Sequence, residues 1–234
     1  AVTAEIVAER NGISRQLQDE LALADQLRAA HAIAQGYFKG QIAPVDIHAR
    51  TGSTQFSVDE HPRATSLEQL ASMRPAFKKD GSVTAGNASG LNDGAAALVL
   101  ASAGAVTSGN LTPMARLVAY AHAGVEPELM GLGPVPATRL ALKRAGLTIN
   151  DMDVIEANIA FAAQACAVMQ ELDMDPAKVN PNGSGIALGH PVGATGAIIA
   201  TKAIHELHRI QGRYALATMC IGGGQGIAVI FERV

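Results

Sequence analysis

Apolar residues recur at three- and four-residue steps over residues 3–35, which is the spacing of one face of an α-helix. Ser14, with the acidic residues Asp19 and Glu20 behind it, marks a helix start within this stretch. We therefore expect one short helix followed by one longer helix. A further short helix is predicted over residues 66–73, capped by Ser66.

Extended segments are predicted between and after these helices. QIAPVDIHA and STQFSVDE are separated by Arg50-Thr51-Gly52, which is typical of a hairpin turn. The run VTAGNASGLNDGAAALVLAS starts with small residues that allow a backbone to approach a ligand, and its Ala, Leu and Val residues then predict a helix or a buried strand. Residues 105–113 are rich in turn formers and indicate a boundary.

After residue 113, strand and helix patterns alternate, which predicts an α/β fold with a sheet covered by helices. The expected strands are ARLVAYAHAG, DVIEAN, KVNPNGSG, YALATMC and GIAVIFERV. The expected helices are PATRLALKRAG, IAFAAQACAVMQEL and a segment over residues 194–209.

Composition narrows the class of protein. The chain is 48% hydrophobic with only 3% aromatic residues, so its core must consist of small and aliphatic side chains. A net charge of -3 without a basic cluster argues against nucleic acid or an anionic membrane as partner and favours small molecules. The two cysteines, Cys166 and Cys220, form neither a disulfide framework nor a zinc spacing, and no targeting segment is visible, so we expect a cytoplasmic protein without a metal.

Two glycine-rich stretches are candidates for chemistry. Residues 180–196 place five glycines around Gly189-His190-Pro191. This stretch is either a tight turn with a core histidine or a loop that holds a reactive imidazole, whereas a phosphate loop lacks its lysine and spacing. In CIGGGQG, Cys220 is either a structural cysteine or a reactive one beside glycine N–H groups that can face developing negative charge.

Two polar stretches complete the set of candidates. Asn158 follows the strand pattern DVIEA, where it acts either as a helix cap or as a ligand-binding group at the carboxyl end of a strand. TAGNASGLNDG, residues 84–94, read alone is a turn with polar caps.

Together the four stretches resemble the thiolase family. Thiolases carry Gly-Asn-Ala-Ser-Gly, Asn-Glu-Ala-Phe-Ala, Gly-His-Pro and Cys-Ile-Gly-Gly-Gly segments in this order and at about these separations. The resemblance covers essentially the whole chain and is strongest to the biosynthetic and β-ketothiolase branch. It implies a thiolase-like fold and acyl transfer between coenzyme A thioesters, either as Claisen condensation with acetyl-CoA or as thiolysis of 3-ketoacyl-CoA, in fatty acid or polyhydroxyalkanoate metabolism.

The resemblance also implies residue roles. Cys220 corresponds to the cysteine that removes or returns the α-proton, a task for a base of moderate pKa. His190 corresponds to the histidine that promotes thiolate formation at the nucleophilic cysteine and donates to a thioester oxygen. Asn158 corresponds to the residue that holds a water in the same oxyanion hole, and the N–H of Gly222 contributes to the other oxyanion hole.

Coenzyme A and acyl-CoA are implied as substrates, and no permanently bound cofactor is expected. Ser89 and the backbone around Ala85 correspond to the region along the pantetheine arm. Ala160 and Phe161 correspond to its apolar wall, and Arg63 is a weaker candidate for the nucleotide end.

Two departures from the family pattern stand out. The family's nucleophilic cysteine, which lies upstream of the segment aligned with Ala1, has no counterpart here, and Ile159 replaces the glutamate of Asn-Glu-Ala-Phe. We expect the change at Ile159 to loosen the water site or alter His190, which would lower activity. Because the chain also starts without Met inside a helical pattern, we expect a preceding segment that was truncated, cleaved or placed on another chain.

The resemblance implies three parts of the chain. Residues 1–91 correspond to the later part of a coenzyme-A-binding loop domain, residues 92–112 to the last piece of an N-terminal domain, and residues 113–234 to a C-terminal domain with the order β-α-β-α-β-α-β-β. A chain without most of the N-terminal domain exposes apolar surface, so we expect it to be unstable or to aggregate alone. We expect a homo-oligomer, a dimer or tetramer.

Two other functions compete with this reading. A noncatalytic acyl-CoA-binding or assembly protein of thiolase descent is favoured by Ile159 and by the missing cysteine, but it has no need for the retained His190, Cys220 and Asn158. A ketoacyl synthase relative shares the fold but uses histidines or a His-Asn pair, which Cys220 and the glycines after it argue against. The histidines of HELHR lack the order of a zinc helix and are expected at the surface.

Overall fold

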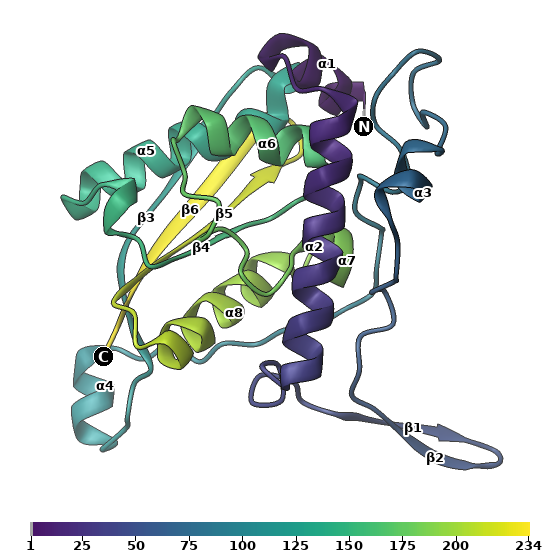
Figure 1. Cartoon of the computed structure of the whole chain (residues 1–234). Helices are drawn as coiled ribbons and strands as arrows, with labels where there is room; N and C mark the ends of the chain where they lie inside the picture. The colour runs from purple at the N-terminus through teal and green to yellow at the C-terminus, as the bar shows by residue number, and fades with distance from the viewer. Residues whose placement is uncertain (1) are drawn as a thin grey trace.

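A mixed sheet of four strands forms the centre of the computed structural model, which describes residues 2–234 (Figure 1). The strand order is β3-β6-β5-β4, with β4 and β5 parallel and the other neighbours antiparallel. The strands are β3 (Ala115–Gly124), β4 (Val154–Ala157), β5 (Tyr214–Ile221) and β6 (Gln225–Arg233).

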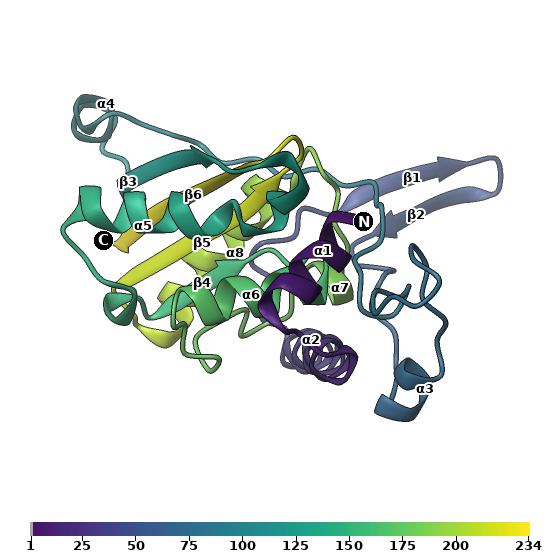
Figure 2. The same ribbon diagram turned by 90° about the horizontal axis from the view of Figure 1, so that it is seen from above.

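Helices cover both faces of this sheet. α5 (Pro134–Ala145) and α6 (Ala162–Glu171) lie on one face and α8 (Thr195–Ile210) lies on the other (Figures 1 and 2). On the α5 and α6 side, buried Leu216 and Ile230 pack with residues of both helices, as the expected aliphatic core requires. The α/β fold with a mixed sheet and covering helices is therefore confirmed.

The N-terminal part is helical, as predicted. α1 (Val2–Asn11) leads into α2 (Arg15–Gln35), where the Ser14 Oγ accepts a bond of 3.1 Å from the Leu17 N–H. α2 packs against α6 and α7 (Gly185–Leu188). α3 (Leu67–Ala71) begins after Ser66, whose Oγ accepts from the Gln69 N–H at 3.3 Å. Among the residues described, no helix combines the length and apolar character needed to cross a membrane.

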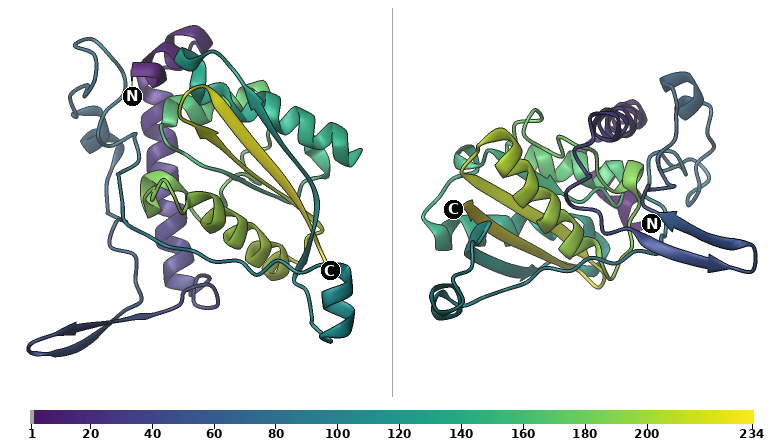
Figure 3. Two further views of the ribbon diagram at one scale, coloured as in Figure 1. Left: turned by 180° about the vertical axis from the view of Figure 1, so that it is seen from behind. Right: turned by 90° about the horizontal axis from the view of Figure 1, so that it is seen from below.

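The predicted hairpin is also present. β1 (Val45–Ala49) and β2 (Gly52–Phe56) pair antiparallel and project away from the body of the molecule (Figures 2 and 3). Shorter elements connect the rest of the chain: α4 (Ala103–Ser108), η1 (Pro127–Leu132) and η2 (Ile149–Asp151).

The helix or buried strand expected at the end of VTAGNASGLNDGAAALVLAS is wrong. Residues 92–102 are neither helical nor part of a strand, and the side chains of Val99 and Leu100 are 97% and 82% exposed. An apolar extended segment becomes a buried strand only when a neighbouring strand satisfies its backbone groups, and none does so within residues 2–234. A helix capped by Ser102, α4, occupies part of the predicted turn-rich boundary instead.

The strand expected over KVNPNGSG is wrong: this segment forms only a single β-bridge, between Val179 and Ile155. Pro181 has no N–H to donate, and Asn180 and Gly183 adopt φ values of 47° and 80°, which turn the chain away from the sheet. The Asn180 side chain replaces the strand: its Oδ1 accepts from the Ala157 N–H at 2.9 Å and its Nδ2 donates to the Ala157 carbonyl at 2.8 Å.

Candidate active site

Asn158 and His190 meet at the edge of the sheet, although 32 residues separate them in the sequence. Asn158 directly follows β4, and its N–H donates to the Thr218 carbonyl of β5 at 3.0 Å. Its Nδ2 lies 3.5 Å from the Nε2 of His190. A Cβ at Gly185 would approach the Asn158 Oδ1 to 3.0 Å and the Ile159 carbonyl to 2.5 Å, so glycine at 185 allows this close packing.

The His190 loop is fixed by two residues that the sequence did not single out. The His190 N–H donates to the Asn92 Oδ1 at 3.0 Å, and the Nδ1 lies 2.7 Å from the Thr195 Oγ1. Gly189 has φ +90°, and a Cβ there would approach the Asn92 side chain to 2.7 Å. Asn92 lies within the candidate stretch TAGNASGLNDG, and Thr195 follows His190 by five residues, which were the signals available in the sequence.

Burial controls the charge of His190. Loss of solvent lowers the pKa of this imidazole below its ordinary value. The ring is therefore neutral at neutral pH and has a free lone pair with which to accept a proton. A neutral histidine beside an amide can take a proton from a thiol and then donate it to a substrate oxygen.

Cys220 lies at the same edge of the sheet. It is two residues beyond Thr218 on β5, whose carbonyl accepts from Asn158. The side chain is 6% exposed, and burial raises the pKa of the thiol to about 11. The sequence led us to expect a base of moderate pKa. The structure gives instead a thiol that ionises reluctantly, because none of the described residues supplies a nearby cation that lowers its pKa.

The glycines after Cys220 form the turn between β5 and β6. Gly223 and Gly224 have φ values of +89° and +91°, and a Cβ at Gly224 would approach the Val125 carbonyl to 2.4 Å. At Gly222, by contrast, a Cβ would meet nothing within 4 Å. The same holds at Gly223, and both glycines are exposed.

The residues expected along coenzyme A form a second group. The Ser89 N–H donates to the Ala160 carbonyl at 2.9 Å, and Ala88 forms an antiparallel bridge with Phe161. Ser89, Ala160 and Phe161 therefore lie on two loops that run side by side, whereas Ala85 is exposed on the first of these loops.

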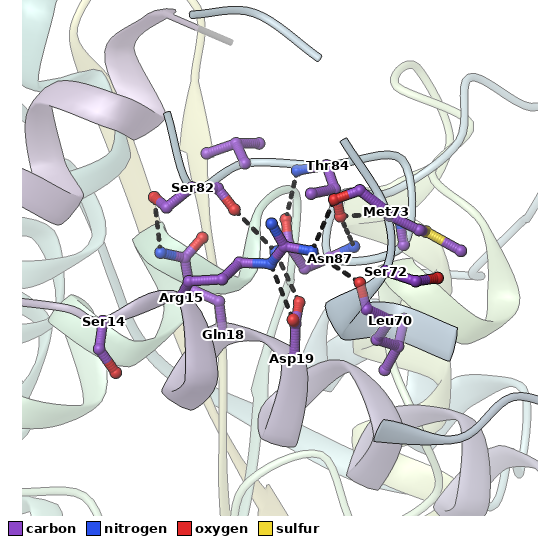
Figure 4. Close-up of polar contacts among 12 residues, drawn as sticks. Ser14, Arg15, Gln18, Asp19, Leu70, Ser72, Met73, Ser82, Thr84 and Asn87 are labelled. Carbon is purple, nitrogen blue, oxygen red and sulfur yellow. Dashed lines mark hydrogen bonds and ion pairs between the residues drawn. The ribbon is translucent and has the colours of Figure 1, made fainter. Parts of the chain in front are cut away.

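A buried polar cluster ties this first loop to α2 (Figure 4). The Asn87 Nδ2 donates to the Asp19 Oδ1 at 2.9 Å, and the Asn87 Oδ1 accepts from the Thr84 N–H at 2.8 Å. Arg15 Nε donates to the other Asp19 oxygen at 2.7 Å, and its Nη2 donates to the Leu70 carbonyl at 2.6 Å. The loop that carries Ala85 and Ser89 is thereby fixed from inside the protein.

Arg63 is exposed and contributes a backbone contact, in which its N–H donates to the Gln26 Oε1 at 3.1 Å. Its neighbour His61 reaches the site indirectly, because the His61 Nδ1 lies 3.2 Å from the Asn92 Nδ2. Sequence reasoning missed His61, since only folding places residues 61, 92 and 190 in contact.

Ile159 lies outside the reactive group. Its side chain is 1% exposed and packs in an apolar cluster with residues of α2, α3 and α6, while its N–H donates to the Ser184 Oγ at 3.2 Å. An effect of this residue on His190 must therefore act through the backbone of the Asn158 loop.

A buried ionic network supports the loop before His190. Lys202 Nζ donates to the Glu156 Oε2 at 2.8 Å and to the Gly183 carbonyl. The Asp25 Oδ2 accepts from the Ala187 N–H at 2.8 Å, and burial raises the pKa of Asp25 to about 6. This network links α2, β4 and α8 beneath residues 183–190.

Comparison with protein families agrees with this arrangement. The model for the thiolase N-terminal domain matches residues 1–104, and the model for the thiolase C-terminal domain matches residues 111–233. The beta-ketothiolase BktB of Cupriavidus necator is 62% identical over 235 residues, which cover 100% of this chain and 60% of the relative. An acetyl-CoA acetyltransferase of Escherichia coli is 54% identical over 100% of this chain and 59% of its own length.

Solved structures give the same result. The acetyl-CoA acetyltransferase of Bacillus anthracis superposes with a TM-score of 0.97 at 51% identity, over 99% of this chain and 59% of that one. Human mitochondrial 3-ketoacyl-CoA thiolase in complex with CoA gives a TM-score of 0.93 at 47% identity, over 100% of this chain and 58% of that one. The chain thus spans about 60% of the length of the relatives it matches. On its sequence, its fold and the arrangement at its sheet edge, this chain belongs to the thiolase family.

Proposed function

We propose that this chain supplies the His190, Cys220 and Asn158 half of a thiolase active site. The observation that carries the proposal is the 3.5 Å approach of Asn158 Nδ2 to His190 Nε2 at the sheet edge where Cys220 lies one residue before the end of β5. Three side chains with these chemistries at one edge suit proton transfer next to a polarised carbonyl better than binding alone. The relatives named above are thiolases and acetyl-CoA acetyltransferases.

In this proposal the reaction is reversible. His190 and a water held by Asn158 stabilise the oxygen of the thioester as enolate character develops. Cys220 exchanges the α-proton, while the N–H of Gly222 faces the other oxyanion. A thiol with a pKa of about 11 is a strong base once ionised. In the condensation direction its proton goes to the coenzyme A thiolate that leaves when the acyl group moves to the nucleophilic cysteine, and the Cys220 thiolate then accepts the α-proton.

The nucleophilic cysteine of the proposal comes from outside the 234 residues. Of the two cysteines in the sequence, Cys166 is buried in α6, and burial raises its pKa to about 12. Such a thiol is inert as a nucleophile at neutral pH. The further segment that supplies the cysteine is therefore a required partner.

The proposal also covers substrates and organisation. Coenzyme A thioesters lie along the loops of Ser89 with Ala85 and of Ala160 with Phe161, and Arg63 faces the nucleotide end. One neighbour in the structural comparison was solved in complex with CoA. We retain residues 1–91, 92–112 and 113–234 as the domain division, and a cytoplasmic homo-oligomer as the working form.

Thiolysis of acetoacetyl-CoA tests the proposal. Loss of the enolate absorbance after addition of coenzyme A is expected with the protein that carries this chain. His190→Ala and Cys220→Ala are each expected to lower turnover by about 10²–10⁴-fold, the usual contribution of a general acid or base. Cys166→Ala makes the same chemical change at a buried cysteine of α6, which lies in a core cluster with residues of α1, and should keep turnover within about threefold.

A noncatalytic acyl-CoA-binding or assembly protein is the competing function. It predicts that coenzyme A binds without turnover and that His190→Ala leaves binding unchanged. That pair of results would overturn the catalytic proposal.

A further inference from the structure

Thr195 is the first residue of α8, and its hydroxyl is turned back toward His190. The residue is 2% exposed, and the preceding position, Ala194, offers no side chain to cap the helix. A threonine inside a helix commonly donates its hydroxyl to the carbonyl four residues back in the sequence. Here the Oγ1 lies 2.7 Å from the His190 Nδ1 and 3.0 Å from the Pro191 carbonyl oxygen.

These two contacts favour one position of the ring proton. The Thr195 hydroxyl donates to the Pro191 carbonyl oxygen, which also accepts from the Ala194 and Thr195 N–H groups at 2.8 and 2.9 Å. The Oγ1 then accepts from His190, which requires a proton on Nδ1. The opposite nitrogen, Nε2, is left with a free lone pair and faces the amide nitrogen of Asn158. The ring is held at both nitrogens by neutral groups.

We propose that Thr195 is a positioning residue that holds His190 in the Nδ1–H tautomer, so that Nε2 is the nitrogen that exchanges protons in the site. When Nε2 takes up a proton, Thr195 continues to accept from Nδ1–H and stabilises the imidazolium. The catalytic meaning of this arrangement depends on the proposed function, whereas the tautomer itself can be measured without turnover.

Asn92 holds the main chain at His190. Its Oδ1 accepts from the His190 N–H, and its Nδ2 contacts His61, so the main chain at His190 is fixed independently of Thr195. Removal of the Thr195 hydroxyl also removes its bond to the Pro191 carbonyl, but that carbonyl keeps its bonds from the Ala194 and Thr195 N–H groups, so the loop should stay in place while the protonation of the ring changes.

Nitrogen-15 histidine spectra of the purified protein test the tautomer directly, because protonated and unprotonated ring nitrogens resonate at well separated shifts. The His190 signals are identified by their loss in His190→Gln. The wild-type protein and Thr195→Ser are expected to show Nδ1–H. Thr195→Val, which has the same shape without the hydroxyl, should lower the ratio of the Nδ1–H to the Nε2–H form by about tenfold, the equivalent of one hydrogen bond.

Thr201→Val is the matched control. Thr201 lies in the same helix, and its hydroxyl donates to the Ala197 carbonyl at 2.9 Å without a histidine contact, so this variant should leave the His190 signals unchanged. A wild-type ring in the Nε2–H form, or an unchanged ratio in Thr195→Val, would overturn the proposal. If Thr195→Val fails to fold by circular dichroism, Thr195→Ala takes its place under the same criteria.

Turnover separates this inference from the proposed function. In an active protein, Thr195→Val should lower kcat and shift the acid limb of its pH profile, with KM unchanged, and Thr195→Ser should restore both. Equal loss in the valine and serine variants would contradict a positioning role. Absence of turnover in the wild type would count against the proposed function and leave the measured tautomer as it stands.

Discussion

Strand β5 and residues 95–100 have similar apolar sequences and opposite environments. In β5, YALATMCI, Leu216 is fully buried, whereas in AAALVL Leu100 is 82% exposed. β5 is hydrogen-bonded to β4 and β6 and lies between helices on both faces, while residues 95–100 pair with no strand among residues 2–234 (Figure 3, left). Apolar composition creates the tendency to be buried, but backbone partners decide whether burial occurs.

Charged side chains also differ in burial between the sheet region and the surface. The sheet region buries Glu156 and Lys202 as an ion pair, whereas Lys78 and Glu9 form an exposed pair at 3.7 Å. A buried pair that loses one partner leaves an uncompensated charge, and an exposed pair does not. The sheet region is therefore expected to respond to substitution far more strongly than the surface.

The largest effect on stability is expected for Lys202→Met, which leaves the buried Glu156 carboxylate without its cationic partner. The free energy of unfolding should fall by about 3–5 kcal/mol in urea titrations, as for other broken buried pairs. Lys78→Met, in the exposed pair, should change it by less than about 1 kcal/mol. Equal losses in the two variants would show that burial does not distinguish these pairs.

Leu216→Ala and Leu100→Ala make the same chemical change at a buried and at an exposed leucine, so together they test how much apolar burial contributes to stability in the two segments. The cavity left beside Ile155 and Ile230 should cost about 2–5 kcal/mol of unfolding free energy. Leu100→Ala removes an exposed side chain and should stay within about 0.5 kcal/mol. A large loss at Leu100 in the same urea titration would mean that this segment is buried in solution.

Asp25→Asn tests how a buried carboxyl group of this region makes stability depend on pH. The folded-state pKa of about 6 lies above the ordinary value of 3.8, so Asp25 favours folding below pH 3.8, and this contribution is lost as the pH rises through 6. Two units correspond to about 3 kcal/mol at most, and the pKa of about 6 already includes the attraction of Lys202. The variant keeps an acceptor for the Ala187 N–H. Thermal melts should show it about 1–3 kcal/mol more stable than the wild type at pH 7.5 and no more stable at pH 4.

The smallest effect on folding, but a clear one on solubility, is expected for Val99→Ser. The exposed apolar run should make the isolated chain aggregate, and one hydroxyl should reduce the aggregated fraction in light scattering at unchanged melting temperature. Ile47→Ser, on the exposed hairpin, is the control. If the hairpin variant alone reduces aggregation, association occurs through β1 and β2 and not through residues 95–100.

Local signals in the sequence located most elements correctly. Ser14 and Ser66 cap helices as predicted, because a side-chain oxygen satisfies the first helical N–H groups wherever the rest of the chain lies. The hairpin turn at residues 50–52 is equally local. The two wrong elements, residues 95–100 and KVNPNGSG, are those whose structure depends on distant strand partners or on the turn geometry at Asn180 and Gly183.

The candidate site divides in the same way. The candidate reactive residues, His190, Cys220 and Asn158, could be chosen from motifs, since glycine-rich loops and strand ends are visible in the sequence. The side chains that hold these residues in place, such as Thr195 and Asn92, could not be chosen from the sequence, because they act through contacts that the fold alone creates.

The sequence by itself determined the family resemblance, the alternation of helices and strands and the choice of candidate reactive side chains. These depend on residue type and short spacing, which folding does not alter. Only the tertiary structure decided that residues 95–100 stay exposed, that Cys220 has a raised pKa and that Thr195 contacts the ring of His190. Burial, proton affinity and hydrogen-bond partners depend on what lies across space, because solvent exclusion and geometry arise when distant segments pack together.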